Sequence, residues 1–234
     1  MTTLSRNARV AGLLYLTLLV APLRLIYIPS KLIVSGNAAA TASNIAAHQT
    51  LFRLGILTDL FTAVMCIFVT LALYRLFKGV DQMLAAIMVI LGSLMVAPIY
   101  FLNTLNDAAT LLLVRGADFL SVFDKPQREA LAMLFLRLHH HGVVVNEVFW
   151  GLWLLPFGLL VYKSRFLPRI LGVWLVLNCF AYLAQSVTGI MWPQYEDVVG
   201  NYSFPLLLAE LAIMLWLIIM GAKERQPVAA AAPA

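Results

Sequence analysis

The sequence predicts an all-α fold: a polytopic membrane helical bundle of six transmembrane helices with short outer-surface helices. Apolar residues make up 62% of the 234 residues and charged residues only 12%. The mean hydropathy of +0.91 is far above that of soluble domains. Apolar runs of roughly 20 residues recur along the chain, long enough for a helix to cross a ~30 Å hydrocarbon core. The runs are continuous rather than alternating, so the predicted spans are helices.

Six apolar runs qualify as membrane spans. Arg6 and Arg9 precede the first run, and residues 38–40 resemble a signal-peptidase site. A cleaved signal peptide is therefore an alternative for this run, but the small residues lie too far beyond it. We expect spans at residues 10–28, 54–74, 84–105, 143–162, 167–187 and 202–220.

Prolines help to place the ends and the bends of these spans. Pro168 and Pro205 stand near the starts of the last two runs, where the first turn of a helix does not need the missing N–H. Pro22, Pro98 and Pro156 lie inside spans. We expect kinks at these three positions.

Two connections are long enough to form helices outside the spans. Within residues 29–50, an alanine-rich stretch favours a short helix that Asn37 can cap. Within residues 115–141, Asp124 and Gln127 resemble a capping box that opens an amphipathic helix. We expect this second helix to lie on, or dip into, the outer leaflet.

The domain organisation is simple. Residues 1–225 are expected to form a single six-helix transmembrane domain without an internal repeat. The Ala- and Pro-rich residues 226–234 have the composition of a disordered tail.

Basic residues predict the orientation, because Lys and Arg are retained on the cytoplasmic side of short loops. The expected location is the bacterial cytoplasmic (inner) membrane, with several passes and both termini cytoplasmic. This topology accounts for the net charge of +5 and the pI of 9.4, so we predict membrane lipids as partners and no nucleic acid. Nine basic residues gather on one side: Arg6, Arg9, Arg75, Lys78, Lys163, Arg165, Arg169, Lys223 and Arg225.

Polar residues inside the spans predict a shared layer. Arg24, Asp59, Glu147 and Gln185 each lie 15 or 16 residues from the basic residue that marks the cytoplasmic end of their own span. That spacing places all four roughly 22 to 24 Å from the cytoplasmic edge. Glu210 lies slightly deeper, and helix tilt shifts each depth by several ångströms.

Ionisable groups at such depths face the bundle interior and mark functional sites. Arg24 neutralises one carboxylate, which leaves at least one of Asp59, Glu147 and Glu210 to be protonated, unusually solvated, or paired with a ligand, metal or histidine. The alternative is that Arg24, Asp59 and Glu147 form a clamp that only specifies helix packing. The predicted ligand-binding residues are Arg24, Asp59, Asn103, Asp107, Asn146, Glu147, Gln185 and Glu210.

Asn103 and Asp107 lie near the outer edge of the third span, and a histidine triplet at residues 139–141 is expected at the same rim. His139, with Asp59, Asp107 or Glu147, would make a hard-metal or zinc site. The alternatives are hydrogen bonds to lipid headgroups and a proton relay, because histidine titrates near physiological pH. Tryptophans 150 and 153 just below Glu147 are able to wall an apolar ligand.

Several stretches together resemble one family of bacterial membrane proteins, known only as domain of unknown function 4386. The resemblance covers nearly the whole chain and implies a bacterial multi-pass protein. It brings no established activity, substrate, cofactor or catalytic residue. The stretches are residues 27–34 (YIPSKLIV), 40–45 (ATASNI), 51–55 (LFRLG), 101–106 (FLNTLN), 116–118 (GAD), 136–139 (LRLH), 149–156 (FWGLWLLP) and 164–172 (SRFLPRILG).

Three functional hypotheses follow from these residues. The first is an outward-facing polar pocket that binds, or transports, a small-molecule or lipid ligand of amphipathic character. The second is a membrane-embedded metal-dependent hydrolase at the outer leaflet, in which a metal held by His139 and a carboxylate activates water. The third is a non-enzymatic scaffold whose polar layer fixes packing. The sequence specifies neither a cofactor nor whether the protein is an enzyme.

Overall fold

The computed structural model describes residues 2–223 of the chain. Over this range the protein is helical and contains no strand, which confirms the all-α prediction. Six helical stretches of the described chain are long and apolar enough to cross a membrane. The predicted tail at 226–234, and the last two residues of the predicted domain, lie outside the described residues.

Each span is built from one or more helical elements. The first combines α1 (Thr3–Leu16), the 3-10 turn η1 (Thr17–Val20), the π segment η2 (Leu23–Tyr27) and α2 (Ile28–Leu32). The others are α4 (Gln49–Phe77); α5 (Gln82–Val89) with the π segment η3 (Ile90–Leu94) and α6 (Val96–Arg115); α7 (Lys125–Leu152) with α8 (Leu154–Ser164); α9 (Arg169–Met191); and η5 (Pro193–Tyr195) with α10 (Glu196–Ile219).

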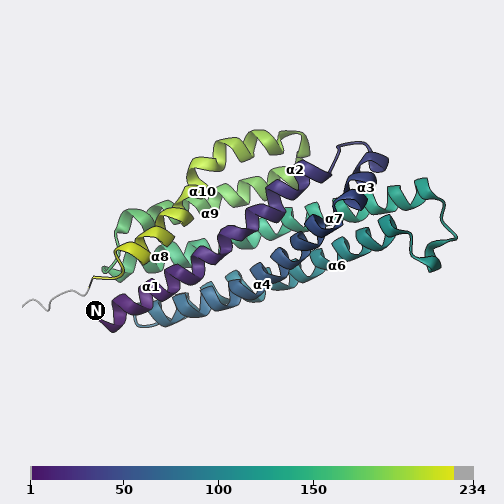
Figure 1. Ribbon diagram of the computed structural model, residues 1–234. Helices are drawn as coiled ribbons and strands as arrows, with labels where there is room; N and C mark the ends of the chain where they lie inside the picture. The colour runs from purple at the N-terminus through teal and green to yellow at the C-terminus, as the bar shows by residue number, and fades with distance from the viewer. Residues whose placement is uncertain (1, 224–234) are drawn as a thin grey trace, which may run out of the picture.

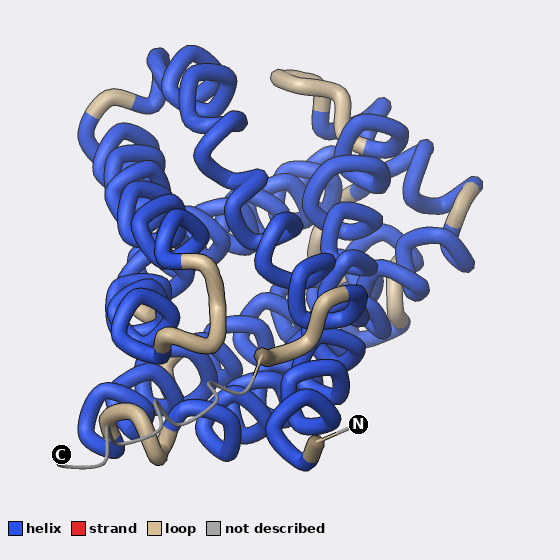
Figure 2. Tube along the Cα trace, turned by 90° about the vertical axis from the view of Figure 1, so that its left-hand side faces the viewer, coloured by secondary structure: helices blue, strands red, loops and turns tan. Residues whose placement is uncertain are grey.

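The spans run side by side along the length of the molecule (Figure 1). The first and last described residues lie at one end, called here the near end, as an even number of crossings requires. The opposite, far end carries α2, the short helix α3 (Ala38–Ala47) and the tip of the α6–α7 hairpin, where η4 (Asp118–Leu120) lies. Turned by 90°, the same helices are seen packed around one another (Figure 2).

The capping residues correctly predicted where the two outer helices, α3 and α7, begin. Asn37 accepts a hydrogen bond from the Ala40 amide and begins α3. Asp124 accepts from the Gln127 amide at 2.8 Å, and Gln127 accepts from the Asp124 amide at 3.0 Å, which completes the predicted capping box of α7.

The predicted separation of the second helix from the fourth span is wrong. Instead of ending near residue 141, α7 continues without a break for 28 residues and enters the span directly. Gly142 lies inside this helix, and its missing side chain makes room for Asn103 on α6. The α6–α7 hairpin therefore extends beyond the other helices at the far end (Figure 1).

Prolines interrupt the spans near the expected positions. Pro22 separates the 3-10 turn from the π segment of the first span, and α6 and α8 begin two residues before Pro98 and Pro156. A proline cannot donate a backbone hydrogen bond, so the helix changes pitch or breaks beside it. Pro205 differs from the prediction: it lies inside α10, because that helix begins earlier, at Glu196.

Small residues bring the helices into close contact at the near end. A side-chain carbon on Gly158 of α8 would lie 2.6 Å from the Gly172 carbonyl of α9, so both positions require glycine. The neighbouring apolar core contains Tyr15, Phe77 and Phe157, all at most 1% exposed. This packing holds the framework in which the polar residues of the far half are arranged.

Candidate functional site

A buried ion pair joins the first span to the third. Arg24, on the π segment η2, donates from Nε to Asp107 Oδ2 at 2.9 Å and from Nη2 to Asp107 Oδ1 at 2.6 Å. The two side chains are 3% and 0% exposed. This two-pronged geometry is the strongest that a guanidinium and a carboxylate can form.

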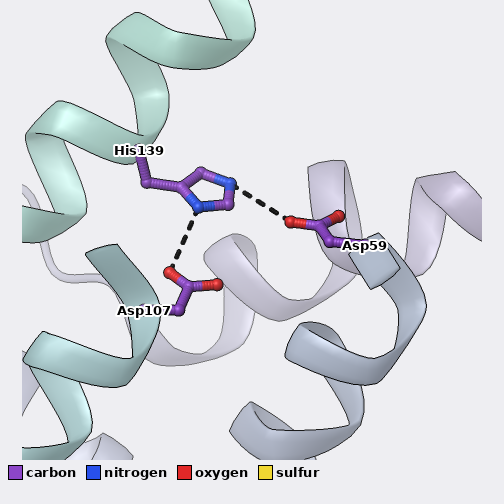
Figure 3. Close-up of side chains that lie close together, drawn as sticks. All are labelled: Asp59, Asp107 and His139. Carbon is purple, nitrogen blue, oxygen red and sulfur yellow. Dashed lines mark ion pairs between the residues drawn. The ribbon is translucent and has the colours of Figure 1, made fainter. Parts of the chain in front are cut away.

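His139 on α7 lies between Asp107 and Asp59, which is on α4 (Figure 3). Its Nδ1 is 3.2 Å from Asp107 Oδ1 and 3.1 Å from Arg24 Nη2, while Nε2 is 3.8 Å from Asp59 Oδ2. Four spans thus contribute one side chain each to a polar cluster formed by Arg24, Asp59, Asp107 and His139. All four residues are buried.

Glycines make room for the polar cluster. A side-chain carbon on Gly55, one helical turn before Asp59, would lie 2.7 Å from Arg24 Cδ. On α7, a side chain at Gly142 would overlap Asn103, whose carbonyl lies 3.4 Å from His139 Nδ1. Close approach of the backbones at these two positions lets long polar side chains meet in the interior.

The cluster could hold either a proton or a metal ion. Arg24 contributes one positive charge and the aspartates two negative charges, so a protonated His139 balances the cluster and a neutral His139 leaves it with one negative charge. One ligand atom from each of Asp59, Asp107 and His139 lies within 4.8 Å of the others, as metal coordination requires. Arg24, however, already occupies both oxygens of Asp107.

Of the other predicted ligand-binding residues, Asn103 borders this cluster through its backbone carbonyl, 3.4 Å from His139 Nδ1. Asn103 and Asn146 are buried, and Asn146 Oδ1 and Gln185 Nε2 are buried without a hydrogen-bond partner among the described residues. Glu147 is half-buried, and within residues 2–223 no hydrogen bond or ion pair joins it to Arg24. Arg24 binds Asp107 rather than Glu147. The predicted clamp of Arg24, Asp59 and Glu147 is therefore wrong in its third residue.

The three histidines of the triplet point in different directions and have different surroundings. His140 lies 3.2 Å from Glu196 and is about half exposed, and His141 contacts the Arg137 carbonyl at 2.9 Å. Only His139 of the three points into the interior, because successive residues on a helix are about 100° apart.

Glu210, which is half-buried, forms a second polar centre near the middle of α10. Its carboxylate accepts hydrogen bonds from the hydroxyl of Tyr15 on α1, the hydroxyl of Tyr182 on α9 at 2.9 Å and the amide of Asn178 at 3.4 Å. Tyr15, Asn178 and Tyr182 are not among the ligand-binding residues that the sequence predicts. The sequence feature that could have identified them is a polar side chain in the middle of an apolar span.

Glu210 lies at the wall of a cavity of about 340 Å³ between the spans. Trp150 and Trp153 also line this cavity, as do Tyr100 and the two tyrosines that bind Glu210. The remaining wall is mainly aliphatic. Of the eight predicted ligand-binding residues, Glu210 is the one that lines it.

The cavity opens sideways, between the first span and α10. Its lining includes Leu19 of the first span together with Phe204 and Leu208 of α10, which are 48%, 59% and 38% exposed. These residues belong to apolar helices that cross the membrane. The opening therefore faces the hydrocarbon region of the bilayer.

Comparisons with known proteins identify relatives but no activity. The model of one family, described as "Domain of unknown function (DUF4386)", matches residues 10–221. A protein of Archaeoglobus fulgidus, described as "Uncharacterized protein", is 29% identical over 79 residues, which are 34% of this chain and 46% of that protein. The chain thus matches less than half the length of this curated relative. No solved structure matches the chain.

Proposed function

We propose that this chain, which belongs to the DUF4386 family, binds a small amphipathic molecule in the cavity between its membrane-spanning helices. The observation that carries the proposal is the cavity itself. Its volume is about 340 Å³, its wall consists mainly of aromatic and aliphatic side chains, and the carboxylate of Glu210 forms part of that wall. Ligand pockets typically enclose roughly 300–1,000 Å³ and combine apolar walls with a few polar groups.

The sideways opening favours a ligand that partitions into the bilayer. Such a molecule reaches the cavity between Leu19 and Phe204 without leaving the hydrocarbon region. An apolar chain would contact the aliphatic wall, and a polar head would meet Glu210. Transport of the bound molecule across the membrane would be an extension of this function.

A cavity-filling variant tests the proposal. The probe is monodecylglycerol, a neutral single-chain amphiphile, and the full chain is examined by native mass spectrometry. Leu18→Trp places a large ring in the cavity lining, whereas Leu13→Trp adds the same ring at an exposed position of the same span. We expect a one-to-one adduct with wild type and Leu13→Trp that is lost in Leu18→Trp. Equal adducts in all three proteins would overturn the proposal.

We propose the bacterial cytoplasmic membrane as the location, with the near end on the cytoplasmic side. The support is the distribution of basic residues, since Arg6, Arg75, Lys163 and Arg169 all lie close to near-end helix termini. Membrane lipids are the partners that six spanning helices imply.

Metal-dependent hydrolysis is a second candidate function. It is favoured by the mutual approach of Asp59, Asp107 and His139. It is disfavoured by Arg24, whose positive charge would lie beside the metal. Metal analysis of the purified protein tests it: a stoichiometric divalent ion that disappears in His139→Ala is expected if the site is a metal site. A metal-free wild-type protein that still binds monodecylglycerol would leave the ligand cavity as the function.

A further inference from the structure

The cavity has a negative group and no positive one. Among the described residues that line it, within 2–223, Glu210 is the only one with a formal charge, and none is a lysine, arginine or histidine. Arg24, the buried cation of the far half, is bound to Asp107 and is absent from the lining. A carboxylate in an apolar environment without a cation is costly, so a cationic ligand would be stabilised here.

The three hydrogen-bond partners of Glu210 can all donate to an ionised carboxylate. Tyr15 donates to Oε2, while Tyr182 and Asn178 donate to Oε1, so both oxygens act as acceptors. All three partners are neutral. They orient the carboxylate and stabilise its charge, but they do not neutralise it.

Aromatic rings surround the same space. The rings of Tyr15 and Trp153 are 5.6 Å apart between centroids, those of Trp150 and Tyr182 are 5.9 Å apart, and those of Tyr100 and Trp150 are 6.1 Å apart. All five side chains line the cavity with Glu210. Aromatic faces attract cations through their quadrupole, most strongly when the cation has lost its water, and they recognise quaternary ammonium groups in this way.

We infer that the cavity selects organic ammonium ions that carry an apolar chain. Glu210 would be the counter-ion, the tyrosine and tryptophan rings would surround the ammonium group, and the chain would extend along the aliphatic wall toward the opening between the first span and α10. This inference rests on the proposed function, because it names the class of amphiphile that the cavity takes.

Three probes with the same chain test the inference in nanodiscs: decyltrimethylammonium, monodecylglycerol and decyl sulfate. The full-length wild-type protein is expected to bind the ammonium probe roughly tenfold or more tightly than monodecylglycerol, and decyl sulfate least tightly. Glu210→Gln keeps the shape of the side chain and removes its charge, so the preference for ammonium should disappear. Asp197→Asn removes an exposed charge from the same helix and should keep the preference.

Two outcomes would overturn the ammonium inference. One is a wild-type protein that binds monodecylglycerol as tightly as the ammonium probe, and the other is a preference for ammonium that survives Glu210→Gln. In either case, binding of monodecylglycerol would leave the proposed amphiphile cavity standing, whereas failure of all three probes in wild type would remove both. Retained binding of monodecylglycerol by Glu210→Gln shows that the variant is folded.

The ammonium group could belong to a membrane lipid or to a free amphiphile. Nanodiscs of phosphatidylethanolamine and of phosphatidylglycerol distinguish these sources. If the headgroup of a membrane lipid occupies the cavity, decyltrimethylammonium should bind wild type more weakly in phosphatidylethanolamine nanodiscs than in phosphatidylglycerol nanodiscs. Both affinities are corrected for partitioning of the probe into the lipid. If the ligand is a free cation, the corrected affinities should be equal.

Discussion

Arg24 joins two spans of the bundle, but burying its charge costs free energy. Its guanidinium is buried, paired with Asp107 and in contact with His139. Burying two charges costs several kcal/mol per ion, and the pair recovers this only while both partners are present. The Arg24–Asp107 pair therefore specifies how the first and third spans meet.

Removing one partner should be far more harmful than removing both. Arg24→Met leaves Asp107 buried opposite Asp59 and is expected to destabilise the protein by about 3–5 kcal/mol. The double variant Arg24→Met/Asp107→Leu should recover most of that loss, measured by unfolding in micelles. Glu129→Gln is the surface control, because its partner Lys125 is 79% exposed, and it should cost less than about 1 kcal/mol. A double variant no more stable than Arg24→Met would show that Asp107 is required for another reason.

At the scale of elements, helix ends tie the near end together. Asp81 precedes α5, accepts a hydrogen bond from the Leu84 amide at 3.1 Å and pairs with Lys163 Nζ, at the end of α8, at 3.0 Å. The Leu84 hydrogen bond first, and then Lys163, lower the pKa of Asp81 below its ordinary value. The turn between α4 and α5 is thereby joined to the fourth span.

This interaction predicts a dependence of stability on pH. Because the folded pKa of Asp81 lies below its unfolded value of about 3.9, its contribution is present above that value and is lost as pH falls through the folded pKa. Asp81→Asn keeps a helix cap and removes the ion pair. We expect a slightly lower melting temperature than wild type at pH 7 and a difference that shrinks below about pH 4. The exposed Asp197→Asn is the control, and a difference that grows in acid would contradict the assignment.

At the scale of the whole molecule, six spans place the ends of the described chain on one side. The loop between α6 and α7 at the far end and the turn between α4 and α5 at the near end therefore lie on opposite sides of the membrane. The two native cysteines, Cys66 and Cys179, are buried, so single cysteines can be introduced without competing labels.

Cysteine labelling of intact cells tests the proposed orientation. A membrane-impermeant maleimide should label Ser121→Cys, in the far-end hairpin, and should not label Lys78→Cys at the near end; both positions are exposed. Permeabilised cells should show labelling at both positions. The reverse pattern in intact cells would place the near end outside, and labelling of both would contradict a closed membrane between them.

The sequence by itself determined the class of fold, the number of spans and several helix ends. These features depend on local quantities: the length of an apolar run, the side chain of a capping residue and the missing N–H of a proline. The position of Trp150 and Trp153 just below Glu147 in the sequence predicted that they can wall an apolar ligand, and both line the cavity. The local signals failed at residues 139–142, where α7 continues through the histidine triplet and through Gly142, whose missing side chain leaves room for Asn103 of α6.

Only the tertiary structure decided which polar residues meet. Counting along a span gives the depth of a side chain, but the rotation of each helix about its axis decides which neighbour that side chain faces. Asp107 had been placed near the outer edge of the third span, whereas α6 extends eight residues further, to Arg115, and Asp107 binds Arg24 in the interior. The cavity beside Glu210 depends on the packing of all six spans together, so no single segment of sequence contains it.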